Sequence, residues 1–320
     1  MGLPIVVKSQ EEFVNINNVP IHVRTWGRSL NDPLEDVREL IVFIPGMVGG
    51  LPNFYITMLS TLFLSLNGEV PIWIVGQAGH AEPKPTTNAF VLPLKGNEIL
   101  YDINGQVRSK VEFLKEYVPS NVKVHLVAHS LGTWMTLKIL KQYPEVKILF
   151  QKCYLLFPTI RGTEDGKNIN CKISEIIFWI YDHFRFIVVF FAKLPYCVKA
   201  VLFSIAFWIS SVDREHVNPA IAFSKPSILD KCVFLSKEAV ETLRYTVMDV
   251  ELLEKHKRLL KLYYGATDGW VPLRAFREIK WAIPDIDAEI DTYEIEHSIV
   301  FKSSVLMGNI LGKMVKENML

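Results

Sequence analysis

A serine at position 130 stands between an apolar, strand-like segment and a segment with helical character. The strand-like segment covers residues 122–130, and the helical segment begins at Leu131. The residues two positions before and after the serine, Ala128 and Gly132, are both small. A sharp strand-to-helix turn needs small residues there, because the bend presses their Cα atoms against neighbouring backbone and leaves the serine Oγ exposed. Short patterns of this kind also occur by chance, so the prediction of a reactive serine depends on the rest of the chain.

Strand and helix patterns alternate along most of the sequence. Residues 12–26 predict a β-hairpin around an Asn17-Asn18 turn. Apolar residues at helical spacing predict a helix over residues 97–118, and another helix near residues 273–282 precedes a closing helix. Further short apolar strands are predicted at residues 39–46, 71–79, 122–130, 152–158, 258–265 and 288–297. This alternation predicts one α/β core with a mostly parallel central sheet flanked by helices.

Residues 159–246 interrupt the alternation. They are rich in aromatic and aliphatic residues and contain no strand–helix repeat. We therefore interpret them as an inserted lid rather than as another layer of the sheet. The predicted organisation is a first part of the core over residues 1–158, a hydrophobic lid or membrane-association insertion over residues 159–246, and a second part of the core over residues 247–320.

The most apolar part of the insertion covers residues 176–212. The whole chain is 50% hydrophobic with a mean hydropathy of +0.21, which indicates apolar surface beyond what a core needs. Polar residues 182–185 and Pro195 divide the segment, so neither half is the roughly 20-residue apolar run that a transmembrane helix needs. We predict two short helices that enter a lipid monolayer from one side, and a buried lid is the alternative. The predicted lipid contacts are Phe190, Phe191, Phe203 and Phe207.

The charge and cysteine patterns exclude several functional classes. The 35 basic and 34 acidic residues are mixed along the chain, so no basic field is expected to hold nucleic acid. The four cysteines are widely spaced and form no C-x-x-C pair, which favours reduced thiols in a cytosol-facing protein and predicts no metal site. The sequence begins without a long apolar signal core and contains no N-glycosylation sequon, so secretion is not expected.

A serine hydroxyl becomes a strong nucleophile only when a histidine takes its proton and a carboxylate orients that histidine. For a serine in a strand-to-helix turn, the chain order is serine, acid, histidine. Of the eight histidines, only His297 follows the last predicted strand and precedes the last helix. Asp268 follows the strand at residues 258–265, although an Asx turn before Gly269 is an alternative role for it. Ser130, Asp268 and His297 are therefore the predicted catalytic residues.

Two backbone amides are predicted to stabilise the oxyanion of an acyl-transfer intermediate. The first is the N–H of Leu131, which begins the helix after the serine and gains from the helix dipole. The second is expected from the glycine-rich segment FIPGMVGG, which offers the amides of Gly46, Met47 and Val48. Met47 is the predicted donor, and a plain Pro-Gly turn is the alternative for this loop. The predicted chemistry requires no metal and no organic cofactor.

Several separated segments together resemble the lipid droplet-associated hydrolases, and they span most of the chain in order. The segments LLFPTI at residues 155–160 and YYGATDGW at residues 263–270 are more specific to this family than the HSLG elbow, which many hydrolases share. The remaining segments are the IPG loop followed by Asn53-Phe54-Tyr55, the Ala78-Gly79-His80 stretch, and His297. The chain departs from the family pattern in two places: Ala128 replaces the usual elbow glycine, and Met-Val-Gly stands where the family's oxyanion loop reads Asn-Pro-Gly.

The resemblance implies an α/β-hydrolase at the lipid droplet surface and the cytosolic face of the endoplasmic reticulum, with sterol esters as proposed substrates. It also assigns the triad to Ser130, Asp268 and His297. The leading hypothesis is hydrolysis of a lipid ester through a serine-linked acyl-enzyme. Two alternatives stay open: a catalytically weak hydrolase-fold protein that acts as a droplet binding or scaffold factor, and an acyltransferase that uses the same acyl-enzyme.

Overall fold

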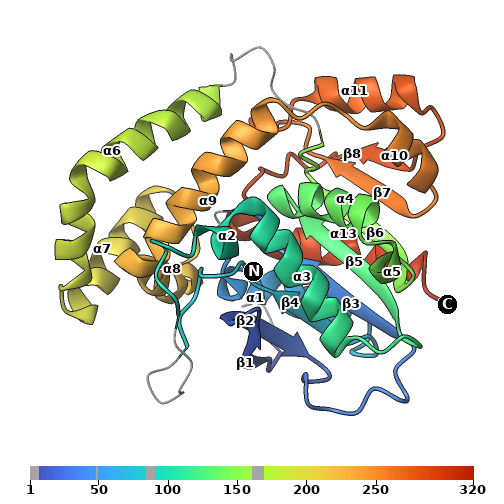
Figure 1. Cartoon of the computed structure of the whole chain (residues 1–320), viewed down its shortest axis with the longest axis horizontal. Helices are drawn as coiled ribbons and strands as arrows, with labels where there is room; N and C mark the ends of the chain where they lie inside the picture. Colours follow the sequence, from blue (N-terminus) through green and yellow to red (C-terminus); the bar gives the residue numbers. More distant parts are fainter. Residues whose placement is uncertain (1–6, 48–49, 84–90, 161–168) are drawn as a thin grey trace.

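A computed structural model describes residues 7–47, 50–83, 91–160 and 169–320 (Figure 1). Within these ranges the central sheet has eight strands in the order β1-β2-β4-β3-β5-β6-β7-β8. β2 is antiparallel to both β1 and β4, and the other neighbouring strands are parallel. The strands are β1 (Gln10–Ile16), β2 (Val19–Trp26), β3 (Glu39–Ile44), β4 (Ile72–Val75), β5 (Lys123–His129), β6 (Phe150–Leu156), β7 (Leu260–Tyr264) and β8 (Ala288–Ile290). The predicted mostly parallel α/β sheet is confirmed.

The predicted N-terminal hairpin is present, and its turn explains the asparagine pair. Asn17 and Asn18 have φ angles of 53° and 62°. Asparagine tolerates this left-handed region better than most residues, and two such residues in succession match the right-handed twist of a hairpin. The turn sets Ile16 opposite Val19 and therefore fixes the register of β1 on β2.

Helices cover both faces of the sheet, which is why its inner strands are continuous apolar runs. On one face, α1 (Ile56–Ser65) packs against α13 (Ser304–Lys316), and their buried residues form one core with those of β3 and β4. On the other face, a second core includes residues of α3 (Ile103–Tyr117), α4 (Leu131–Gln142), α10 (Val250–His256) and α11 (Leu273–Ala282). The shorter helices of the core are η1 (Pro52–Tyr55), α2 (Glu98–Tyr101), α5 (Pro144–Lys147) and α12 (Ile299–Lys302).

The last predicted strand is shorter than its sequence indicated. The alternation over residues 288–297 predicted a strand to the end, but β8 stops at Ile290. The next residue, Asp291, is buried, and its carboxylate accepts hydrogen bonds from Tyr263 Oη and from the backbone N–H groups of Tyr293 and Ile295. This carboxylate bends the chain away from the sheet edge, so the segment that carries His297 is a loop.

The segment after β6 forms a group of helices that extends away from the sheet (Figure 1). They are α6 (Ile169–Ala192), α7 (Tyr196–Ile209), η2 (Arg214–His216), α8 (Val217–Phe223) and α9 (Pro226–Arg244). α9 lies between the core and α6, whereas α6 and α7 project outward, and we call these two helices the apolar arm. α6 has a kink at Phe184, and Pro195 precedes the first residue of α7. Across the described part of the chain, no helix combines the length and apolar character needed to cross a membrane.

Candidate active site

Ser130 occupies the sharp turn between β5 and α4. Its backbone has φ 51° and ψ −120°, a strained conformation for a residue with a side chain. A Cβ on Gly132 would lie 2.5 Å from the carbonyl oxygen of Ile44, which explains the requirement for glycine there. The hydroxyls of Thr133 and Thr159 both donate to the Ser130 carbonyl oxygen, at 2.6 and 3.0 Å. The strained turn is therefore held from two different segments of the chain.

The structure brings Ser130, His297 and Asp268 into one line of hydrogen bonds. His297 Nε2 is 2.8 Å from Ser130 Oγ, and His297 Nδ1 is 2.7 Å from Asp268 Oδ2. The Asp268 side chain is fully buried, and its second oxygen accepts the backbone N–H of Trp270 at 2.7 Å. A carboxylate in this place keeps a proton on Nδ1, so Nε2 is free to accept the serine proton. Ser130 and Asp268 lie in the turn and the loop that the sequence predicted, and His297 lies in a loop where the sequence predicted the end of a strand.

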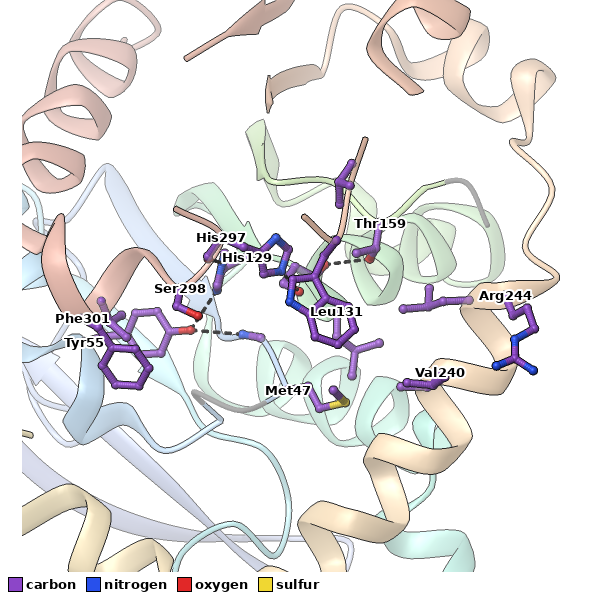
Figure 2. Close-up of a pocket in the computed structure, with 17 residues that line it drawn as sticks. Met47, Tyr55, His129, Leu131, Thr159, Val240, Arg244, His297, Ser298 and Phe301 are labelled. Atoms are coloured by element: carbon purple, nitrogen blue, oxygen red, sulfur yellow. Dashed lines mark hydrogen bonds between the residues drawn. The ribbon is translucent and has the colours of Figure 1, made fainter. Parts of the chain in front are cut away.

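The two predicted oxyanion donors lie on the same cavity. Leu131 is the first residue of α4, and Met47 follows β3 (Figure 2). The neighbouring amide of Gly46 donates to Tyr55 Oη at 3.3 Å, so its N–H is already engaged inside the protein. Val48, the third amide that the sequence offered, lies outside the described residues. Met47 therefore remains the candidate donor from this loop.

An apolar cavity of about 210 Å³ lies over Ser130 and His297 (Figure 2). One wall comes from α9, through Ala239, Val240 and Leu243. Other walls come from the loop after β3, from the residues beside His297 and from α12. The sequence predicted that the insertion is a lid, but it did not single out α9 as the helix that lines the site.

Phe157 is a residue of the site that sequence reasoning missed. It has a positive φ of 52°, and its ring lies edge-on to the His297 imidazole with a centroid distance of 5.6 Å. A Cβ on Gly265 would come within 2.5 Å of the Phe157 ring, so residue 265 has to be glycine. The two sequence segments that carry the family resemblance, at residues 155–160 and 263–270, thus meet at this contact beneath the histidine. The sequence marked both segments as family motifs, but only the contact between Phe157 and Gly265 explains why they occur together.

The four predicted lipid-contact residues do not share one environment. Phe190 is 67% exposed on the apolar arm. Phe191, Phe203 and Phe207 are only partly exposed. The rings of Phe191 on α6 and Phe203 on α7 meet edge-on with a centroid distance of 5.7 Å, and Phe203 lies 5.9 Å from Phe207 on the same helix. These three rings therefore pack within the arm, while other aromatic and aliphatic residues of the arm are exposed as Phe190 is, among them Phe186, Ile187, Trp208 and Ile209.

Two buried histidines away from the cavity each lie beside a glutamate. His125, buried in β5, is 2.9 Å from Glu39, and His22, buried in β2, is 2.9 Å from Glu11. Among the described residues, no group of three or more His, Cys, Asp and Glu side chains could hold a metal ion. These histidines do not reach the cavity, in contrast to His129 and His297, which line it.

Solved structures with the same architecture include several hydrolases. A serine hydrolase from Cycloclasticus zankles matches with a TM-score of 0.58 at 14% identity, over 97% of this chain and 98% of that one. A laboratory-evolved variant of a potato epoxide hydrolase matches with a TM-score of 0.61 at 12% identity, over 97% and 100% of the two chains. At such low identity the likeness establishes the α/β-hydrolase fold and nothing finer.

Sequence comparison is more specific. The family model described as lipid-droplet associated hydrolase matches residues 37–300. The chain is 37% identical over 311 residues to the lipid droplet-associated hydrolase of Drosophila melanogaster, a match that covers 97% of this chain and 99% of that one. It is 25% identical over 316 residues to the Homo sapiens protein of the same name, with coverages of 97% and 95%. With its α/β-hydrolase sheet, and with Ser130 and His297 on one cavity and Asp268 behind the histidine, the chain belongs to the lipid droplet-associated hydrolase family.

Proposed function

We propose that this hydrolase is a serine esterase that cleaves lipid esters, sterol esters among them, at the lipid droplet surface. The observation that carries the proposal is the line of hydrogen bonds from Asp268 through His297 to Ser130 Oγ, which ends in an apolar cavity. A hydroxyl paired with a carboxylate-oriented histidine is the arrangement that acyl transfer requires. The apolar lining of the cavity suits the hydrocarbon part of a lipid better than a polar metabolite.

In the proposed reaction, Ser130 Oγ attacks the ester carbonyl carbon while its proton passes to His297 Nε2. The N–H groups of Leu131 and Met47 bind the resulting oxyanion. When the intermediate collapses, the bond to the alcohol oxygen breaks, and the leaving alcohol takes the proton from Nε2. Water then attacks the acyl-enzyme by the same route, with His297 as base, and the fatty acid leaves as Ser130 recovers its proton.

We further propose that the apolar arm docks on the phospholipid monolayer of a droplet or on the cytosolic face of the endoplasmic reticulum. No residue of α7 is buried, and the exposed side chains of both helices are mostly aromatic or aliphatic. A patch of this kind is costly in water and is stabilised at a lipid interface. α9 contacts both the arm and the cavity, so docking would bring the cavity close to its substrate. The names of the relatives, which refer to lipid droplets, favour this location.

Labelling with a fluorophosphonate probe tests the nucleophile. The probe is expected to label the native protein and not Ser130→Ala, because only a base-activated serine reacts readily with it. Ser120→Ala, which removes an exposed serine far from the cavity lining, is the matched control and should label normally. Equal labelling of Ser130→Ala and the native protein would contradict the assignment.

Turnover of a sterol ester and of a soluble short-chain ester tests the reaction. His297→Ala and Asp268→Asn should each lower kcat by on the order of 10⁴, the second because the neutral amide no longer holds the proton on Nδ1. Asp285→Asn, on an exposed carboxylate, is the control and should leave kcat unchanged. Labelled protein that turns over neither ester would favour the scaffold alternative, and acyl transfer to an added alcohol in preference to water would favour the acyltransferase.

A further inference from the structure

A second line of hydrogen bonds runs beneath the proposed site and joins segments that are far apart in the sequence. The N–H of Gly46, after β3, donates to Tyr55 Oη at 3.3 Å. Tyr55 Oη, at the end of η1, is 3.0 Å from Nδ1 of His129. His129 Nε2, at the end of β5, is 2.9 Å from the backbone carbonyl oxygen of His297. Figure 2 shows Tyr55, His129 and His297 together on one side of the cavity.

The direction of each bond follows from the groups involved. The His297 carbonyl can only accept, so Nε2 of His129 carries the hydrogen. Burial is the main cause that lowers the pKa of His129, to about 3, so the ring is neutral near pH 7 and its Nδ1 is an acceptor. Tyr55 must then donate to Nδ1, which leaves its oxygen free to accept the N–H of Gly46. Each donor in this line of hydrogen bonds then has one acceptor, so only one assignment of the hydrogens is possible.

We propose that Tyr55 and His129 are positioning residues that hold the oxyanion loop and the His297 loop at a fixed separation. The inference deepens the proposed esterase function and rests on it. Because Tyr55 holds the Gly46 amide, the loop is anchored one residue before the peptide that carries the Met47 N–H. At the other end, the bond from His129 fixes the main chain of the residue whose imidazole must reach Ser130 Oγ.

The second line of bonds acts on the transition state more than on substrate binding. An oxyanion donor contributes only when charge develops on the carbonyl oxygen, so displacing it lowers kcat and leaves KM almost unchanged. A misplacement of about 1 Å can cost about 100-fold in rate. Tyr55→Phe removes one hydroxyl and no other atom, so we expect kcat on a soluble ester to fall about 10- to 100-fold.

The chain offers a matched control at the opposite end of β5. Tyr154 Oη is 3.2 Å from Nδ1 of His125, so this pair is also a buried tyrosine bound to a histidine on the same strand. Neither residue lines the cavity. Tyr154→Phe should lower the free energy of unfolding about as much as Tyr55→Phe does, while kcat per titrated active site stays at the native value. Equal kcat for the two variants would overturn the positioning role.

A double-mutant cycle separates positioning from simple loss of a hydrogen bond. In His129→Gln the side-chain amide can still donate to the His297 carbonyl, but the acceptor for Tyr55 is lost. We expect Tyr55→Phe to have little further effect on kcat in this background, because residues of one network are not additive. His129→Leu, which loses both bonds, should be slower than His129→Gln. Additive effects in the cycle would contradict the proposed network.

Two further readouts distinguish this inference from the proposed function itself. If His129 only positions, the acid limb of the kcat/KM profile is the same in His129→Gln and the native protein, because His297 remains the base. A shifted limb would instead make His129 a titrating catalytic group and overturn the inference. If Ser130→Ala retained full turnover, the esterase proposal would fail. If Ser130 were essential but Tyr55→Phe matched Tyr154→Phe, only the positioning role would fail.

Discussion

At the scale of single residues, Phe157 packs edge-on against the His297 imidazole, and Gly265 leaves the space that the Phe157 ring occupies. We predict that Gly265→Ala lowers both the melting temperature and kcat, because its Cβ would lie 2.5 Å from the Phe157 ring and push that ring toward the imidazole. Overpacking of this kind typically costs about 1–3 kcal/mol of stability. Thermal unfolding and ester turnover would measure the two effects.

The same contact supplies its own rescue variant. Adding Phe157→Leu to Gly265→Ala shortens the opposing side chain and should recover part of the melting temperature. If the double variant were no more stable than Gly265→Ala, the clash would not be the cause of the loss. Recovery of stability without recovery of kcat would mean that the edge-on ring itself orients His297.

Local sequence patterns were sufficient to single out Ser130, Asp268 and His297, which the structure brings together, but not the residues that support them. The serine lies in a short strand–turn–helix pattern, and the acid and histidine follow a fixed chain order. Phe157 adopts a left-handed backbone conformation that phenylalanine rarely takes, and its ring fits only because Gly265 has no side chain. Neither property can be predicted from the local sequence. Tyr55 was visible only as part of a family motif, since its partner His129 is distant in the sequence.

At the scale of secondary-structure elements, α6 is held on α9 by ion pairs. Three ion pairs join Asp230 to Arg185, Lys237 to Asp182, and Arg244 to Glu175. The three α9 residues lie seven apart and face α6, which runs in the opposite direction. The hydroxyl of Tyr181 adds a hydrogen bond of 2.8 Å to the Asp230 carboxylate. Because exposed pairs each contribute only about 0.2–1 kcal/mol, this contact is weak compared with the cores on the two faces of the sheet.

We predict that Lys237→Glu loosens α6, because it places an acid opposite Asp182 in place of a bond of 2.6 Å. Hydrogen exchange in residues 172–190 should become faster, with little change in the melting temperature of the core. Asp182→Lys in the same protein reverses the pair and should restore slow exchange. Lys313→Glu, on an exposed lysine of α13, is the control. Unchanged exchange in Lys237→Glu would show that apolar contacts, not the ion pairs, hold α6.

The apolar arm and β8 illustrate what sequence reasoning could and could not predict about elements. The composition of residues 176–212 indicated two short apolar helices around Pro195. α7 has this form, whereas α6 begins earlier and runs for 24 residues with a kink at Phe184. Which phenylalanines face outward could not be predicted, because the kink at Phe184 changes the helical phase of the residues after it. The end of β8 was missed because Asp291 satisfies backbone N–H groups that would otherwise belong to the strand.

Two triple variants of the arm test the lipid contact. We predict that Phe186→Ser, Phe190→Ser and Trp208→Ser together reduce binding to triolein droplets coated with phosphatidylcholine, while turnover of a soluble ester stays native. These side chains are exposed, and burying each at a lipid interface is worth on the order of 1.5–3 kcal/mol. Replacing Phe191, Phe203 and Phe207 by serine should instead loosen the arm itself, because these rings contact one another. If the variant at Phe186, Phe190 and Trp208 still bound droplets as the native protein does, the lipid contact would lie elsewhere. If the native protein formed dimers in sedimentation and this variant did not, the arm would bind a second copy of the chain instead.

At the scale of the whole molecule, buried neutral histidines make stability depend on pH. His80 is completely buried, and its pKa is lowered to about 3, mainly by burial and further by the charges of Lys110 and Lys231. Below its ordinary value of 6.5 the unfolded chain binds a proton that the folded protein does not, so the free energy of unfolding falls as pH falls from about 6.5 toward 3.

We predict that His80→Leu flattens this dependence. One such histidine contributes a slope of about 1.4 kcal/mol per pH unit between the two pKa values. Neither ring nitrogen of His80 has a hydrogen-bond partner in the described part of the protein, so the apolar replacement removes no bond. Urea unfolding at several pH values between 7.5 and 5 would measure the slopes of the two proteins. Parallel slopes would mean that His80 is protonated in the folded state as readily as in the unfolded one.

The position of α9 has a thermodynamic consequence. One face of the helix lines the cavity through Val240 and Leu243, and another carries the ion pairs to α6. Linkage requires that any coupling carried by such a shared element be reciprocal. If lipid docking increases the affinity of the cavity for an uncleavable ester analogue by some factor, the analogue must increase the affinity of the protein for lipid by the same factor. Occupied enzyme would then leave a droplet more slowly than empty enzyme, and the residence time would report the amount of substrate in the surface beneath it.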